Sequence, residues 1–143
     1  MKLLYYILNK TNKKLGVALK NKKILYHMKN NNDEVYIWMN LESSALLKIL
    51  LEESVKTAEK VNKEYRVLGI KRHKIIDIGT VFGYDGRISI GVLPADEERV
   101  ASILVGFHKD DNKIHTSITT TPKKIALLCI ILNNLITKGI FEE

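Results

Sequence analysis

The segment ALLKILL at residues 45–51 is nearly repeated as ALLCIIL at residues 126–132, 81 positions later. Leucine-rich helices resemble one another by chance, so the weight of this match depends on the surrounding sequence. The same offset places Asn40 on Thr121, two residue types that cap helices, and Pro122 follows where its missing N–H costs nothing. The sequence therefore predicts two helices that begin at equivalent points of a repeated unit.

The strands expected before these helices stay in phase at the same offset. Apolar positions alternate with outward positions in VYIWM and again in IHTSI. Turn-forming residues precede both strands, NNN in one copy and DNK in the other. The matched positions are Val35 with Thr116, Ile37 with Ile118, residues 30–32 with 111–113, and Tyr26 and His27 with Phe107 and His108.

One strand earlier the offset becomes 73, because the second copy carries a longer connection that contains LPADEER at residues 93–99. Insertions of this kind are tolerated in surface connections between strands. The matches at this offset are residues 15–19 with 88–92 and Lys14 with Arg87. A further strand, at residues 3–8 in one copy and 75–82 in the other, completes each unit.

Each unit thus reads as four antiparallel strands followed by one helix. We expect an α+β protein of two β-β-β-β-α repeats, packed as one globular unit, since 143 residues suffice for a single sizeable core. The first repeat covers residues 1–62 and the second residues 72–143. The basic connection at residues 63–71 is able to extend a helix or to begin a strand.

Two four-stranded meanders, each followed by a helix, resemble the architecture of the Whirly and Pur families of single-stranded nucleic-acid-binding proteins. Gly86 and Arg87 partly echo the glycine-arginine opening of the Pur repeat, whereas the lysine-glycine-lysine-alanine signature of plant Whirly proteins is missing. The resemblance implies that a helix covers one face of each sheet and that the other face holds DNA or RNA. Because a shared fold does not fix function, the residues that would bind nucleic acid are inferred from charge and from outward-facing aromatic side chains.

The charge distribution of the chain favours nucleic-acid binding. The chain has 23 Lys and Arg against 16 Asp and Glu, a net charge of +7, and no acidic residue precedes Asp33. A one-signed run of this kind favours an acidic partner, and binding to phosphates would depend strongly on salt. The candidate phosphate-binding side chains in the first repeat are Lys10, Lys13, Lys14, Lys20, Lys22 and Lys23, and the second repeat adds Arg87, Lys113 and His115 as helpers.

Two aromatic residues on one predicted strand favour the same function. If the helix that begins near Leu41 packs on Val35 and Ile37, the alternation of the strand turns Tyr36 and Trp38 to the opposite face. Exposed rings there would stack on bases of any sequence, at about 1–3 kcal/mol per base. The alternative is that these two aromatics form a subunit interface or a second core layer.

The sequence offers little for catalysis. The acidic residues cluster beside turns or on helix surfaces, no histidines lie at metal-ligand spacing, and no Ser, Cys or Thr has a visible base partner. We therefore expect a protein that is not an enzyme and that needs no cofactor or metal.

The expected location is inside the cell. Cys129, the single cysteine, lies in an apolar run and is expected to be buried, and no apolar run is long enough to span a bilayer. The N-terminus lacks the pattern of a signal peptide, which favours a soluble protein with no membrane partner.

The helices point to a second kind of function. Residues 125–132 are apolar all round, wider than the stripe needed to cover one sheet. The helices are expected to pack on each other or on a second copy of the chain, as a homodimer. The alternative to nucleic-acid binding is accordingly a protein-interaction or assembly module with no nucleic-acid role.

Overall fold

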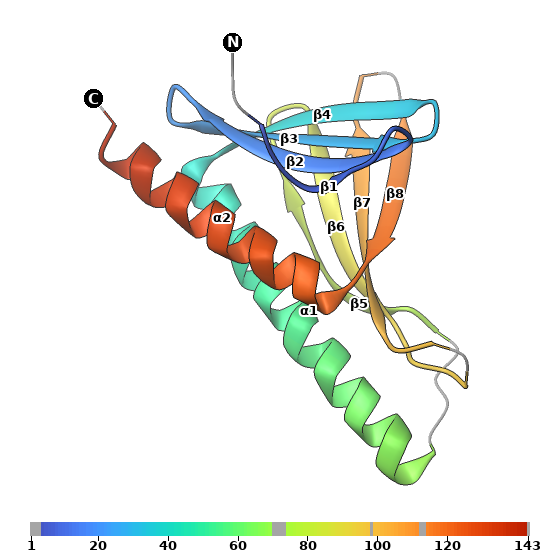
Figure 1. The fold of residues 1–143 in the computed structure, drawn as a ribbon. Coiled ribbons are helices and arrows are strands. Elements are labelled where there is room, and N and C mark those ends of the chain that lie inside the picture. Colours follow the sequence, from blue (N-terminus) through green and yellow to red (C-terminus); the bar gives the residue numbers. More distant parts are fainter. Residues whose placement is uncertain (1–3, 70–73, 98, 112–113, 143) are drawn as a thin grey trace.

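The computed structural model describes residues 4–69, 74–97, 99–111 and 114–142, and it contains the two predicted β-β-β-β-α repeats (Figure 1). In chain order the elements are β1 (Tyr5–Asn9), β2 (Lys13–Lys20), β3 (Lys23–Asn30), β4 (Asp33–Asn40), α1 (Leu41–Leu68), β5 (Ile76–Phe82), β6 (Gly86–Leu93), β7 (Ser102–Lys109), β8 (His115–Thr120) and α2 (Pro122–Ile140). The predicted α+β fold class is confirmed.

Each repeat forms an antiparallel meander, in the order β1-β2-β3-β4 for the first sheet and β5-β6-β7-β8 for the second. The sheets lie across one another, so that the strands of one run at a steep angle to those of the other (Figure 1). The apolar faces of both sheets and both helices enclose one continuous core. Ile37 shows the contact directly, since a Cβ atom added at Gly86 of the second sheet would come within 3.1 Å of it.

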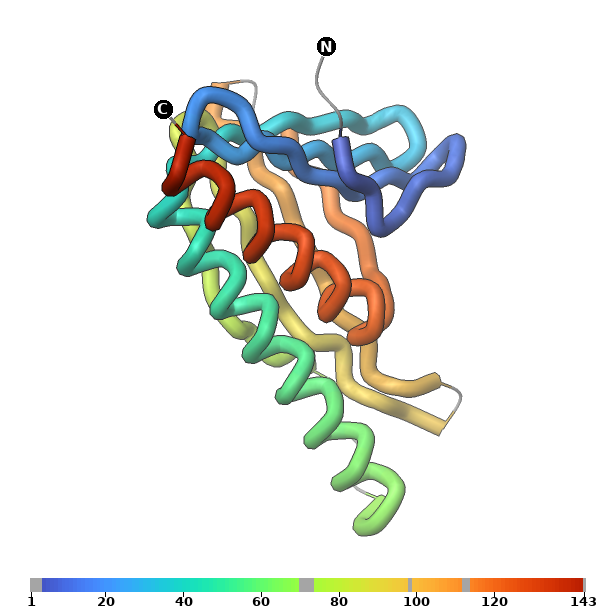
Figure 2. Tube along the Cα trace, turned by 60° about the vertical axis from the view of Figure 1, so that its left-hand side comes forward, coloured from blue at the N-terminus to red at the C-terminus, as the bar shows by residue number. Residues whose placement is uncertain are grey.

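Each helix packs mainly on the sheet of the other repeat. Apart from α2, α1 packs mainly on β5 and β6 of the second sheet, whereas α2 packs on β1 and β2 of the first (Figure 2). Leu50 of α1, for example, fills the space above Gly79 of β5. The condition stated for the first helix, packing on its own strand β4, is met only in small part, because α1 lies mainly on the second sheet, and the repeats interlock through their helices.

The helix starts coincide as predicted. The Asn40 side chain accepts a hydrogen bond from the backbone N–H of Ser43 at 2.7 Å, and Thr121 caps α2 through Lys124 in the same way. The buried positions of the helices also coincide at the offset of 81. The pairs are Ser44 with Ile125, Leu47 with Leu128, Leu51 with Leu132, Ser54 with Leu135 and Ala58 with Gly139.

The pairing register corrects one match. Ile37 faces Tyr26 across β3 and β4, whereas the equivalent Ile118 faces Val105 across β7 and β8. Tyr26 therefore corresponds to Val105, two residues before the predicted partner Phe107. The connection between β7 and β8 is longer by two residues, and a two-residue shift preserves the inward phase of a strand. Both Tyr26 and Phe107 are consequently buried.

The first helix continues beyond the predicted repeat boundary at residue 62. α1 runs through Leu68 and ends at Gly69, whose backbone is left-handed (φ 66°). The connection thus begins as helix, one of the two predicted alternatives. No helix in the described part of the chain is long and apolar enough to cross a membrane.

Candidate nucleic-acid interface on the first sheet

The outer face of the first sheet carries a row of four residues, one from each strand. Tyr6 of β1 pairs with Gly16 of β2, Gly16 with His27 of β3, and His27 with Tyr36 of β4. This face is opposite the apolar face that enters the core, as predicted for Tyr36. The outer face therefore carries the three rings of Tyr6, His27 and Tyr36 in one line across the sheet.

Gly16 leaves room for the Tyr6 ring, which lies over it. A Cβ atom there would lie 2.6 Å from the Tyr6 ring, so any other residue would force that ring to shift. The Tyr6 ring meets His27 edge-on, with centroids 5.9 Å apart, and the Tyr6 hydroxyl lies 3.1 Å from His27 Nδ1. Tyr6 and His27 thus form one packed unit.

His27 and Tyr36 form the stacked half of the row. Their rings are nearly parallel, at 12°, with centroids 4.4 Å apart. Glu34 holds both, since one carboxylate oxygen lies 2.9 Å from His27 Nε2 and accepts a hydrogen bond from the Tyr36 hydroxyl at 2.8 Å. Tyr36 remains 41% exposed, whereas His27 is only 3% exposed. The outward-facing ring is therefore held at a fixed angle.

The protonation states follow from this network. Burial lowers the pKa of His27 more than the Glu34 carboxylate raises it, which favours the neutral imidazole. The hydrogen bond from Tyr36, followed by that from His27, lowers the pKa of Glu34, which stays ionised. Burial, and then the bond to Glu34, raises the pKa of Tyr36 to about 12. Tyr6 then donates to Nδ1, and Nε2–H donates to the carboxylate.

Lysines lie at both ends of this face. Lys14 pairs with Lys29 at one end of the β2–β3 hairpin, and Lys20 pairs with Lys23 at the other. The two pairs are about 20 Å apart at roughly 3.4 Å per residue. These candidate phosphate-binding lysines therefore form two separate groups, because an eight-residue strand lies between them. The aromatic row lies between the two basic ends.

The other lysines predicted in the first repeat lie beside the turns. Lys10 and Lys22 are exposed in the connections that flank β2, and Lys13 is exposed at the start of that strand. Lys13 shares the phase of the buried Leu15, so it lies at the rim of the inner face.

Trp38 lies on the outer face of β4, as predicted, but a turn of the second repeat partly covers it. The backbone N–H of Tyr84 donates to the Trp38 carbonyl oxygen at 2.9 Å, and the Trp38 N–H donates to Asp85 Oδ1 at 3.1 Å. Lys109 pairs with Asp85 and also donates to the Tyr36 carbonyl oxygen. The edge of β4 is therefore closed by the β5–β6 turn.

Two helpers predicted in the second repeat lie on a different surface. Arg87 and the exposed His115 occupy the outer face of the second sheet, where Arg87 pairs with His108 and His108 with His115. Phe82 extends this row on β5. Lys113 lies outside the described residues. The structure thus does not bring these helpers onto the aromatic row of the first sheet.

Sequence reasoning missed several residues of the interface. The outward phase of β3 contained the signal for His27 and Lys29, because both alternate with buried residues. Glu34 was hidden by its place beside a turn, and Tyr6 by the uncertain phase of the first strand. Tyr84 had no local signal, since its position depends on contact between the two repeats.

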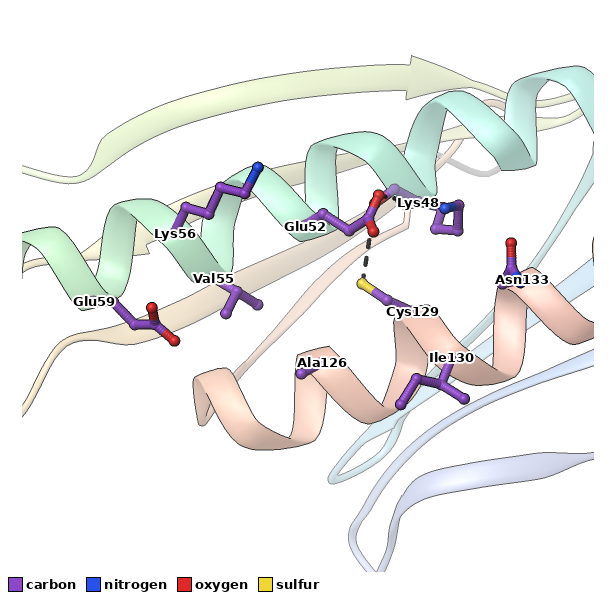
Figure 3. A pocket seen from close by; sticks show the side chains of 9 residues that line it. All are labelled: Lys48, Glu52, Val55, Lys56, Glu59, Ala126, Cys129, Ile130 and Asn133. Atoms are coloured by element: carbon purple, nitrogen blue, oxygen red, sulfur yellow. Dashed lines mark hydrogen bonds and ion pairs between the residues drawn. The ribbon is translucent and has the colours of Figure 1, made fainter.

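A separate groove lies away from this face, between the two helices and towards their outer side. It has a volume of about 600 Å³ and is lined mainly by lysines, glutamates and small apolar side chains (Figure 3). Burial, and then the charge of Glu52, raises the pKa of the Cys129 thiol to about 11. Among the described residues no group of three or more His, Cys, Asp or Glu is placed to hold a metal ion.

No family model matches the chain, and a sequence comparison with curated proteins finds no matching relative. The functional interpretation therefore depends on the surfaces described above.

Proposed function

We propose that this chain binds single-stranded DNA or RNA, with little sequence preference, on the outer face of the first sheet. The observation that carries the proposal is the aromatic row that ends in Tyr36, placed between the lysine pairs at the two ends of the β2–β3 hairpin. Rings stack on any base, and lysines on either side neutralise backbone phosphates, which is the usual combination in sequence-tolerant binders. The architectural resemblance to the Whirly and Pur families supports the same interpretation.

Rigidity also supports the proposal. Tyr36 is held from below by His27 and at its hydroxyl by Glu34, so little side-chain freedom remains to be lost when a base stacks on it. Among the described residues of this face Glu34 is the one acidic side chain, and it lies across from Lys29 in the β3–β4 pair. A single strand of DNA or RNA that crosses the sheet between Lys14 and Lys23 would thus meet mostly positive charge.

Fluorescence of Trp38, the only tryptophan, tests the proposal. Titration with a 12-nucleotide oligothymidylate, the matching oligouridylate and a duplex of equal length, each at two salt concentrations, should show salt-sensitive quenching by the single strands. Duplex should compete poorly, because stacked bases cannot reach a sheet-mounted ring. Absence of salt-sensitive binding to either single strand would refute the proposal.

Matched variants locate the surface. Tyr36→Ala should weaken oligonucleotide binding about tenfold, within the range for loss of one stacked base. Tyr5→Ala is the control, since Tyr5 has the same exposure (40% against 41%) but lies beside α2. Equal effects of the two substitutions would contradict this location.

A second pair of matched variants tests the contribution of positive charge to binding. Replacing Lys14 and Lys29 with Gln should reduce the salt slope by about 0.7 for each phosphate that is no longer neutralised. Replacing Lys60 and Lys63, on the distal part of α1, removes the same charge away from the sheet. If both double variants lose affinity equally, net charge and not this face determines binding.

A second candidate function is assembly as a homodimer through the helices. Leu46 and Ile49 of α1 and their equivalents Leu127 and Ile130 of α2 are 48–60% exposed, so both repeats present the same apolar positions to solvent. The charges are complementary between copies, because α2 carries lysines and no acidic residue, whereas the first half of α1 is rich in glutamate. A copy related by twofold rotation would set α2 against α1.

The molar mass in solution, measured by light scattering, decides this point. Ile49→Glu combined with Ile130→Glu should convert a dimer to a monomer, whereas Val67→Glu, at the exposed far end of α1, should not. A monomeric wild-type protein at 100 µM concentration, set at roughly a hundred times a micromolar Kd, would exclude this dimer. If Trp38→Ala changes the mass instead, the sheet aromatics form the subunit interface.

A further inference from the structure

The β5–β6 turn and the edge of the first sheet together form a hollow of about 440 Å³. Its volume lies within the usual range for small-molecule sites. The lining residues come from three segments, the β2–β3 hairpin, β4 and the β5–β6 turn, and they are Lys20, Asn21, Lys23, Trp38 and Tyr84. The hollow therefore exists only because the two repeats meet.

The turn is seated firmly against β4. Two hydrogen bonds fix its position on the strand: the Tyr84 N–H donates to the Trp38 carbonyl oxygen, and the Trp38 N–H donates to the Asp85 carboxylate. Gly83 makes this approach feasible, because a Cβ atom there would lie 2.4 Å from the Trp38 carbonyl oxygen. Tyr84 is 59% exposed, so its ring remains accessible, and it lines the hollow together with Trp38.

The lining has the chemistry of a site for a planar ring with a negative charge attached. Trp38 and Tyr84 offer aromatic surfaces, and the remaining lining residues are two lysines and an asparagine, with no acid. The Lys23 ammonium lies 5.1 Å from the centroid of the Tyr84 ring, which holds a cation against the aromatic wall. Asn21 adds both a donor and an acceptor for the edge of a base.

An anionic oxygen already binds at the rim. The backbone N–H of Lys22 donates to a carboxylate oxygen of Glu142 at 3.0 Å, beside Asn21 and Lys23. Asn21 and Lys22 both have left-handed backbone (φ 50° and 60°), the conformation of a tight hairpin turn. A phosphate oxygen is the same kind of acceptor as that carboxylate.

We propose that this hollow binds one nucleotide unit, with its base against Trp38 and Tyr84 and its phosphate at Lys20, Lys23 and the turn. The inference rests on the proposed function, which it deepens by adding Tyr84 and a defined subsite. The unit belongs either to a single strand or to a free mononucleotide, and the two sources share the same recognition chemistry.

The experiment uses the intact chain and three small probes: thymidine 5′-monophosphate, thymidine and inorganic phosphate. We expect saturable quenching of Trp38 by the monophosphate, weaker quenching by thymidine, and none by phosphate. Tyr84→Ala should raise the Kd of the monophosphate at least fivefold, Tyr84→Phe should retain most binding, and Tyr5→Ala should have no effect. Thermal melts of each variant check that the fold is intact.

The oligothymidylate titration separates this inference from the proposed function. Tight oligonucleotide binding that Tyr84→Ala weakens supports both. Oligonucleotide binding that is indifferent to Tyr84→Ala, with no quenching by the monophosphate, overturns the nucleotide subsite and leaves the proposed function standing. Monophosphate binding that depends on Tyr84, without oligonucleotide binding, supports the subsite as a site for free nucleotides and overturns the proposed function.

Discussion

The thiol of Cys129 lies 4.0 Å from the backbone carbonyl oxygen of Lys48, and these residues occupy the same position in the two repeats. Because the two contacting residues are equivalent, the repeats meet symmetrically where α1 and α2 cross. Gly139 lies close to Leu41 near the opposite ends of the two helices, as an antiparallel crossing requires. The repeated segments ALLKILL and ALLCIIL therefore contact each other where the two helices cross.

The burial of Cys129 at this crossing predicts that its thiol reacts slowly. A pKa of about 11, against an ordinary value of 9.0, leaves roughly 100-fold less thiolate at neutral pH, and the thiolate is the reactive form. Modification by iodoacetamide at pH 7.5 should be at least that much slower in the folded chain than in urea. Equal rates in both states would show that Cys129 is exposed in solution.

The buried pair Tyr26 and Ser44 predicts a measurable stability loss. The Tyr26 hydroxyl donates to Ser44 Oγ at 2.8 Å, and both residues are at most 2% exposed. Tyr26→Phe should cost about 1–2 kcal/mol in the free energy of unfolding by urea, because the serine loses its buried partner. Tyr84→Phe, at an exposed hydroxyl, is the control.

A double variant sharpens the same prediction. Tyr26→Phe combined with Ser44→Ala should cost less than the sum of the single changes, because neither polar group is then left unpaired. Strict additivity would mean that the hydroxyls do not interact.

The aromatic row predicts that acid destabilises the fold. His27 has a folded pKa below its ordinary 6.5, so below pH 6.5 the unfolded chain binds more protons. The free energy of unfolding should therefore fall as the pH drops from 6.5 towards the folded pKa. His27→Gln should flatten this part of the profile, and the same change at the exposed His115 should not.

Glu34 should further reduce the free energy of unfolding at lower pH. Its folded pKa lies below the ordinary 4.5, so its contribution is present above pH 4.5 and is lost as the pH falls through the folded pKa. Glu34→Gln should remove this lower segment and also enlarge the loss at His27, because the carboxylate that raises the pKa of His27 is gone. A pH profile unchanged by either substitution would contradict the network between Tyr6 and Tyr36.

Glu142 predicts a gain in affinity. Its carboxylate lies at the Lys22 turn, where the nucleotide subsite would place a phosphate. Glu142→Gln should tighten oligothymidylate binding about two- to fivefold at low salt, as expected for a nearby charge worth about 0.5–1 kcal/mol. Glu53→Gln, at an exposed position on α1, supplies the same charge change away from the turn. If both variants tighten binding equally, the effect is one of net charge.

Much of the fold could be predicted because its signals are local. Asn40 and Thr121 act as caps through their own side chains, and alternation alone assigns Tyr36 and Trp38 to the outer face. The mistaken match of Tyr26 with Phe107 has a physical reason, since a two-residue shift leaves the phase of a strand intact. Only hydrogen-bond pairing distinguishes the two registers.

The candidate site divides in the same way. The positive charge of the first repeat and the outward positions of its aromatic residues can be read from the sequence. The separation of Lys14 from Lys23 depends on strand length in space, and the closeness of Tyr84 to Trp38 depends on contact between residues 46 positions apart. No periodic pattern reports either relationship.

The sequence by itself determined the order of strands and helices, their starting points, the apolar face of each, and the excess of positive charge. Tertiary structure alone decided that α1 covers the second sheet and α2 the first, and that a turn of one repeat closes the edge of the other. The physical reason is that periodicity specifies which face of an element must leave water, whereas any apolar surface of matching shape can bury it. The choice between the two sheets is made by packing.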